Sequence, residues 1–316
     1  MATADAAARA GEPYSAAPWP TGFSPLDREL AGGLRAGELI VVGGAPGLGK
    51  TTFALQIARN IVSAGGRAAY VCYEHEERVL LQKLVAMEAG LADPVDGATL
   101  AQLATSLRAP GATDQGLLGR IGRLPGAAAA LVHIASYADR MQLVSASGRS
   151  TGPEEIRAIA AGLDGGGVVL VDYLQKVAVG NSAGTEDDRV SVVVESLKDC
   201  AMEFGVPVIA ICAADHHGLA AGRTTLAHMR GSTAIAYEAD IALMLNDKWH
   251  AVARHHLMYS TVNAEQFREW VICSIEKNRT GRADIDIEFQ KQFSHSRFDP
   301  CGRLVREELI DRIFRE

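Results

Sequence analysis

The residues with the clearest chemical potential form one glycine-rich segment that ends in Lys50 and Thr51. Glycines allow positive φ angles, so successive backbone N–H groups can point inward and form a nest for an anion. A lysine in this position reaches the β- and γ-phosphates of a nucleotide, and the Thr51 hydroxyl is suited to ligate Mg²⁺. The pattern GxxxxGK followed by Ser or Thr therefore predicts a site for ATP and Mg²⁺, made by Gly44, Ala45, Pro46, Gly47, Leu48, Gly49, Lys50, Thr51 and Thr52.

Two carboxylates are candidates for the groups that hydrolysis requires in addition. Asp172 follows the apolar run 168–171, so we expect it at the carboxyl end of a buried strand, where ligands bind in open α/β sheets. We predict that it holds Mg²⁺, and the alternative is a cap for the next helix. Glu74 follows the apolar run 68–72, and we predict that it accepts the proton of the attacking water. The alternative for Glu74 is an ordinary surface position.

Short apolar runs that alternate with helical patterns must position these residues. Helices are expected from Lys50, after Glu76 and over 189–204. The alternation predicts an α/β fold with a mainly parallel, twisted sheet covered by helices on both faces. We expect residues 1–20 to form a flexible tail and residues 21–316 a single ATPase domain. The expected strands are 39–42, 68–72, 130–134, 168–171, 206–211, 241–245 and 271–275.

Composition narrows the class of protein. With 31 Lys and Arg against 38 Asp and Glu, the net charge of −7 argues against tight, non-specific binding of nucleic acid by an isolated subunit. The five cysteines lack CxxC spacing, which argues against a disulfide framework or a zinc site. No apolar run is long enough for a bilayer and no signal peptide is recognisable, so we expect a cytoplasmic protein without membrane contact.

The order of these motifs resembles the C-terminal motor domain of DnaB-type replicative helicases, a branch of the RecA-like ATPases. Glu74 matches the family's catalytic glutamate, and the segment 171–175 is similar to its Walker B segment. The resemblance covers about residues 21–298, nearly the whole chain. Its further segments are 21–23, 26–27, 33–34, 37–39, 195–198, 205–210, 226–240, 277–281 and 296–298.

The resemblance implies a homo-oligomer, a hexameric ring in which ATP binds between neighbouring subunits. Lys277 and Arg279 match the family's trans-acting cations, so the resemblance implies that they act on the γ-phosphate held by the adjacent subunit. The alternative for both is a pair of ordinary surface cations at a strand end. The resemblance also implies single-stranded DNA as the partner.

Several departures from the family pattern bear on function. The family's helical N-terminal domain is expected to be missing, and Ala213 stands where the family has a glutamine that links the γ-phosphate to the DNA loops. Asp215 or His216 would have to substitute for it. The candidate DNA loops, 180–189 and 218–225, each carry a single cation, although a groove that tracks a strand normally needs several.

A further departure is the segment 248–267, which has no counterpart in the resemblance. It contains His250, Arg254, His255 and His256, so it predicts either a metal or phosphate site or, alternatively, a solvated insertion between two strands.

Two functions are compatible with these observations. The first is an ATP-driven ring motor that acts on single-stranded DNA, favoured by the extent of the resemblance. The second is a KaiC-like or accessory RecA-like ATPase that works as a nucleotide-dependent switch or assembly scaffold without helicase activity. Ala213 and the acidic loops favour this second function.

Overall fold

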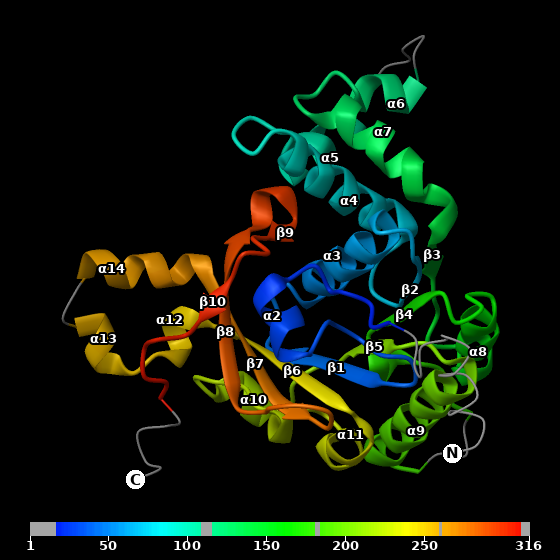
Figure 1. Cartoon of the computed structure of the whole chain (residues 1–316), viewed down its shortest axis with the longest axis vertical. Coiled ribbons are helices and arrows are strands. Elements are labelled where there is room, and N and C mark those ends of the chain that lie inside the picture. The colour runs from blue at the N-terminus through cyan, green and yellow to red at the C-terminus, as the bar shows by residue number, and fades with distance from the viewer. Residues whose placement is uncertain (1–16, 109–115, 181–183, 259–260, 311–316) are drawn as a thin grey trace, which may run out of the picture.

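A computed structural model describes residues 17–108, 116–180, 184–258 and 261–310 (Figure 1). Its centre is a ten-stranded sheet with the order β10-β8-β7-β6-β1-β5-β4-β2-β3, and β9 pairs with β8. The strands are β1 (Leu39–Gly44), β2 (Arg67–Cys72), β3 (Met141–Ser145), β4 (Gly167–Asp172), β5 (Val208–Ile211), β6 (Ile241–Asp247), β7 (Trp270–Asn278), β8 (Ile285–Gln292), β9 (Arg297–Phe298) and β10 (Arg303–Leu304).

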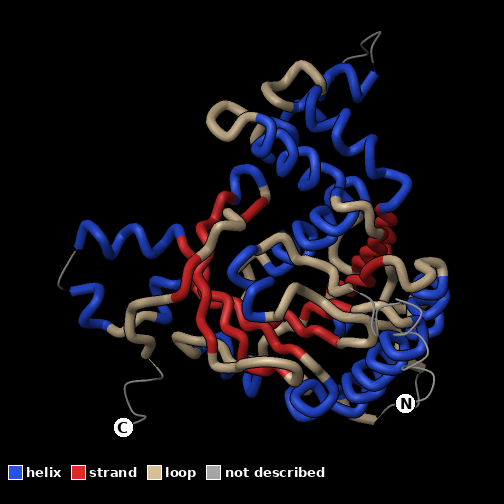
Figure 2. Tube along the Cα trace, viewed as in Figure 1, coloured by secondary structure: helices blue, strands red, loops and turns tan. Residues whose placement is uncertain are grey.

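The strands from β6 to β3 pair in parallel, whereas β7, β8, β9 and β10 pair antiparallel. All residues of β1 and β4 are buried, as a parallel strand covered on both faces requires. Alternate side chains of β1 enter different cores, because Ile40 and Val42 pack with α3 (Lys50–Ser63), while Leu39 and Val41 pack with α9 (Glu186–Phe204). Figure 2 shows helices on both sides of the strands, so the predicted α/β class with a mainly parallel sheet is confirmed.

Six of the predicted strands are present, but the strand predicted at 130–134 is wrong, because these residues lie in α7 (Ala127–Tyr137). The run is short and apolar, and such runs fit a buried strand or a helix equally well. Alanine is the strongest helix former, and Ala127 and Ala130 are both buried on one face of the helix. The neighbouring strand that the sequence reading missed is β3, an edge strand whose residues are only partly buried.

The helices α4 to α7 form a separate layer at the top of Figure 1, with a hydrophobic cluster of its own. Glu88 joins this layer to the helix after the phosphate loop. Its carboxylate, 2% exposed, accepts from Arg59 Nε at 2.6 Å and from Tyr137 Oη at 2.8 Å, and it lies 2.8 Å from His133 Nδ1. The helices of the layer are α4 (Glu77–Ala92), α5 (Leu100–Arg108), α6 (Gly116–Ile121) and α7.

The remaining helices lie at the two faces and at the antiparallel edge of the sheet. The segment after β6 forms short helices at the left of Figure 1, tied to the sheet by a buried ion pair between Lys248 and Glu288. No group of three His, Cys, Asp or Glu among the described residues could hold a metal ion there or elsewhere. Apart from α3, α9 and the layer of α4 to α7, the α-helices of the described residues are α2 (Ser24–Glu29), α8 (Pro153–Ala161), α10 (His216–Ala220), α11 (Ser232–Glu238), α12 (Lys248–Ala251), α13 (Arg254–Met258) and α14 (Thr261–Gln266). The last three form the segment after β6.

The expected tail, 1–20, falls largely outside the described residues. Within the part that is described, Trp19 and Leu34 exchange two backbone hydrogen bonds of 2.7 and 2.8 Å.

None of the helices in the described ranges combines the length and the apolar character that a membrane span requires.

Candidate nucleotide site

The glycine-rich loop connects the end of β1 to the start of α3. Gly44 and Gly49 have φ angles of 140° and 86°, which residues with a side chain rarely adopt. A Cβ atom on Gly44 would lie 2.4 Å from the Leu245 carbonyl oxygen, so only glycine fits. Lys50 Nζ donates to the carbonyl oxygens of Gly44 and Ala45 at 2.8 and 2.9 Å, which places the ammonium over the loop. The loop, the following helix and the lysine therefore face the same space.

Asp172 lies at the carboxyl end of β4, beside the first turn of α3. Its Oδ2 atom accepts from Thr51 Oγ1 at 2.8 Å and from Tyr70 Oη at 2.9 Å. Burial raises the pKa of the Asp172 carboxyl, and the hydrogen bonds from Thr51 and Tyr70 oppose that rise. Because Mg²⁺ prefers oxygen ligands and keeps only one or two from the protein, a hydroxyl and a carboxylate side by side fit this ion. The carboxylate bonds to the Thr51 and Tyr70 hydroxyls, and the turn that follows it, Leu174–Lys176, has no side-chain cap, so the arrangement differs from the cap considered above.

A cavity of about 560 Å³ opens in front of this pair. Glu74, which is exposed, lines it from the segment after β2, so the sequence-predicted Lys50, Thr51, Asp172 and Glu74 meet around one space. Ala213, two residues after the end of β5, lines the same cavity. Its other walls include Pro46, Gly47, Gly49, Thr52, His75, Lys83, Tyr173, Phe293 and Ser296.

Two residues of this site were missed by sequence reasoning. Tyr70 lies within an apolar strand and looks like a core residue until its hydroxyl is seen to donate to Asp172. Lys83 projects into the cavity from α4, where a half-buried lysine gives no sequence signal. Burial lowers the pKa of the Lys83 ammonium, and the negative charge of Asp172 opposes that shift. Lys83 thus adds a second cation from the same chain.

Replacing Tyr70 with Phe is expected to weaken Mg²⁺ binding. The change removes one of two hydrogen bonds that orient the Asp172 carboxylate, and loss of a partner of a metal-binding carboxylate typically weakens metal binding about 10–100-fold. We expect the concentration of Mg²⁺ that half-saturates ATP hydrolysis to rise about tenfold or more. A titration with Mg²⁺ at saturating ATP tests this, and an unchanged midpoint would mean that Tyr70 only fills the core.

Lys277 and Arg279 do not line this cavity and lie near the opposite end of the strands, where β6 begins. Lys277 pairs with Ala242 near the start of β6, whereas Gly44 of the loop pairs with Leu245 near its end. Lys277 Nζ donates to the carbonyl oxygen of Ala236 at 2.6 Å, and Arg279 Nη1 donates to Asp240 Oδ1 at 3.1 Å. Both cations therefore border the C-terminal end of α11, and neither can reach the phosphate loop of its own chain.

The structure also places Arg223, expected in a DNA loop, and Asp215, one of the two candidates to substitute for the glutamine replaced by Ala213. Arg223, the cation of the candidate loop 218–225, is only 8% exposed, and its guanidinium donates to Asp286 Oδ1 at 2.7 Å and to Ser274 Oγ at 3.0 Å. Asp215 caps α10, because its Oδ1 accepts from the Gly218 N–H at 2.7 Å. A sequence cannot distinguish a buried arginine with a remote partner from a surface one, since Asp286 lies far along the chain. The Arg223 guanidinium is therefore engaged inside the protein, and Asp215 uses one carboxylate oxygen in the cap.

The family model described as the DnaB-like helicase C terminal domain matches residues 19–106 and 119–299. The "Replicative DNA helicase DnaB" of Treponema pallidum is 29% identical over 72% of this chain and 47% of that protein. The "Replicative DNA helicase DnaC" of Bacillus subtilis is 30% identical over 72% of this chain and 46% of that protein. The chain thus spans about half the length of these curated relatives.

Two solved structures share the fold. One is described as an ATPase domain and superposes with a TM-score of 0.71 and 20% identity, covering 89% of this chain and 90% of that one. The other, described as a DnaB-like replicative helicase and its interactions with primase, gives a TM-score of 0.69 and 19% identity, covering 89% of this chain and 61% of that one. At this identity the likeness bears on the fold alone, and it confirms the predicted RecA-like architecture. With the family model matching most of its length, the chain belongs to the DnaB-like helicase C-terminal domain family.

Proposed function

We propose that this chain is an ATP-hydrolysing motor that acts on single-stranded DNA as one subunit of a hexameric ring. The single observation that carries the proposal is the separation of the two groups along the parallel strands. Lys50, Thr51, Asp172 and Glu74 surround one cavity where these strands end, while Arg279 bonds to Asp240 where β6 begins. A second copy whose Arg279 faces this cavity would complete the site, and repetition of that head-to-tail contact closes a ring.

The residues around the cavity match the steps of phosphoryl transfer. The N–H groups of the loop and Lys50 bind the phosphates, and Thr51 and Asp172 would hold Mg²⁺, which supplies positive charge to the phosphate oxygens when bound. Water attacks the γ-phosphorus, a new P–O bond forms, and the bond from phosphorus to the oxygen of the leaving ADP breaks. Glu74 takes the proton that the water loses. Arg279 of the neighbouring copy spreads the negative charge of the transition state.

A second function is favoured by specific observations. The buried Arg223 contributes no cation to a DNA groove, and Ala213 has no polar side chain to sense the nucleotide. A switch or scaffold whose assembly follows ATP binding needs neither feature. Family membership favours the motor, and an experiment separates the two.

The experiment measures ATP hydrolysis with and without single-stranded DNA, while light scattering follows the assembly state. The motor predicts a several-fold stimulation by DNA that falls steeply with added salt, together with a six-subunit assembly. Assembly driven by ATP with no response to DNA would replace the motor with the switch.

Replacing Lys50 with Ala is expected to weaken ATP binding strongly. Loss of a partly buried charged partner costs roughly 2–5 kcal/mol, which corresponds to about 30-fold or more in affinity. Calorimetric titration with a non-hydrolysable ATP analogue measures the change. Arg28→Ala, at an exposed cation of α2 that does not line the cavity, is the control and should bind normally. Equal affinity of the two variants would contradict the assignment of the phosphate loop.

A further inference from the structure

The side chain of Gln175 links three segments that meet beside the nucleotide cavity. It lies in η2 (Leu174–Lys176), the short turn that follows Asp172. Its Oε1 accepts from the Ala213 N–H at 3.2 Å, and its Nε2 donates to the Arg230 carbonyl oxygen at 3.1 Å and to Cys212 Sγ at 2.8 Å. The amide therefore uses its acceptor and its donors at the same time.

Ala213 and Arg230 are the two ends of a closed loop. The Arg230 N–H donates to the Ala213 carbonyl oxygen at 3.1 Å, the Asp215 N–H donates to that of His228 at 2.8 Å, and Ala214 bridges to Met229. Residues 214–229, which include α10 and the second candidate DNA loop, therefore form a loop whose two ends are joined by these hydrogen bonds. Gln175 bonds to both ends of this loop, so the turn after Asp172 and the loop cannot move independently while these bonds persist.

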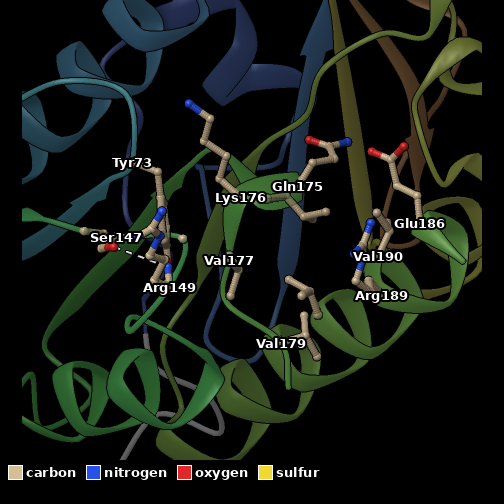
Figure 3. Close-up of a pocket in the computed structure, with 14 residues that line it drawn as sticks. Tyr73, Ser147, Arg149, Gln175, Lys176, Val177, Val179, Glu186, Arg189 and Val190 are labelled. Atoms are coloured by element: carbon tan, nitrogen blue, oxygen red, sulfur yellow. Dashed lines mark hydrogen bonds between the residues drawn. The ribbon is translucent and has the colours of Figure 1, made fainter. Parts of the chain in front are cut away.

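The side chain of Arg230 extends the connection to α9. Its guanidinium pairs with Glu186, in the first turn of α9, which lies within the first candidate DNA loop, 180–189. The two side chains are 40% and 45% exposed, so the pair can exchange partners at low cost. Figure 3 shows Gln175 and Glu186 lining one surface hollow, which also includes Lys176 and Arg189. Gln175 is therefore connected directly to the 214–229 loop, and through Arg230 and Glu186 to the start of α9.

We propose that Gln175 is a positioning residue that transmits the state of the nucleotide site to the 214–229 loop and, through Arg230 and Glu186, to the start of α9. The connection begins at Asp172, whose carboxylate contacts Thr51 of the phosphate loop. The turn that carries Gln175 is held by its own backbone bonds, Lys176 to Tyr173 at 3.0 Å and Val177 to Leu174 at 3.2 Å, so it follows displacements of Asp172. Ala213 has no polar side chain that could link the nucleotide to the loop. Gln175, which follows the neighbouring strand β4, provides that link instead. This inference rests on the proposed function, because it concerns the use of the same site.

Gln175→Glu is the variant that separates positioning from simple packing. It preserves the length of the side chain and the acceptor for the Ala213 N–H, but it cannot donate to Arg230 and places a negative charge against that carbonyl. Gln142→Glu makes the same change at an exposed position of β3 and serves as the control. Glu186→Gln, at a half-exposed position, tests the outer part of the connection without disturbing the core.

The test measures hydrogen exchange of the peptides covering 184–192 and 213–230, with and without ATP and Mg²⁺. In the unmodified chain and in Gln142→Glu, nucleotide should change the exchange rate of both peptides. Gln175→Glu should reduce that response about fivefold or more in both, while ATP binding and DNA-free hydrolysis stay within about twofold. Glu186→Gln should reduce it only in peptide 184–192.

The outcomes separate this inference from the proposed function. A full response in Gln175→Glu, or no response to nucleotide in the unmodified chain, would overturn the role of Gln175. Should Gln175→Glu fail to fold, the decision falls to Glu186→Gln, for which an unchanged response of peptide 184–192 overturns the connection through Arg230. A nucleotide response that depends on Gln175, without any stimulation of hydrolysis by DNA, would support the inference and contradict the motor.

Discussion

Replacing Glu74 with Gln is expected to leave ATP affinity within about twofold and to lower the rate of hydrolysis by roughly 10²–10⁴-fold, the usual contribution of a general base. Glu74 lines the cavity in front of Lys50 and Asp172, and it is exposed enough to contact water directly. Glutamine has nearly the same shape and still accepts a hydrogen bond, but it cannot take the proton of the attacking water. Binding should therefore survive while turnover is lost.

The measurement compares single-turnover hydrolysis with the affinity for a non-hydrolysable ATP analogue. Glu76→Gln is the matched control, because Glu76 is an exposed acid on the same segment that pairs with Arg78 at 2.7 Å and does not line the cavity. Normal turnover in Glu74→Gln would transfer the role of base to another group, and equal losses in both variants would point to a general effect of the segment.

The main elements of the fold and the centre of the site were predictable because their causes are local. A strand buried on both faces must be a continuous apolar run, so β1 and β4 are visible in the sequence. The phosphate loop requires glycines at fixed positions, and Asp172 is found by its place after a strand. Each of these features is determined by residues that are adjacent in the chain, and such residues can be identified from the sequence alone.

The remaining features depend on partners that are distant in sequence. Tyr70 belongs to the site only because Asp172 of β4 lies beside it, and Arg223 is buried only because Asp286 accepts its guanidinium. Gln175 holds both ends of the 214–229 loop through backbone atoms, whose positions no side-chain pattern encodes. The error at 130–134 has a different cause, since a short apolar run fits a strand or a helix until its packing partner is known.

Replacing Arg279 with Ala is expected to lower ATP hydrolysis by roughly 10³–10⁵-fold, the range for an arginine supplied to the transition state from a neighbouring subunit. ATP affinity should change much less, because Lys50 and the loop still hold the phosphates. In this chain Arg279 also donates to Asp240, so a lower activity alone would not distinguish catalysis from support of α11. Thermal unfolding of the variant measures the structural contribution separately.

Mixing two inactive variants distinguishes these roles. A subunit with Arg279→Ala retains an intact phosphate loop, and a subunit with Lys50→Ala retains its arginine, so a neighbouring pair in the right order contains one complete site. With random assembly at equal concentrations, about a quarter of the contacts in a closed ring should be complete. Hydrolysis should then rise from the background of each variant to a comparable fraction of the unmodified rate. If activity stays at background at every mixing ratio although the subunits co-assemble, Arg279 does not act in trans, and its bond to Asp240 explains its effect as support for the end of α11.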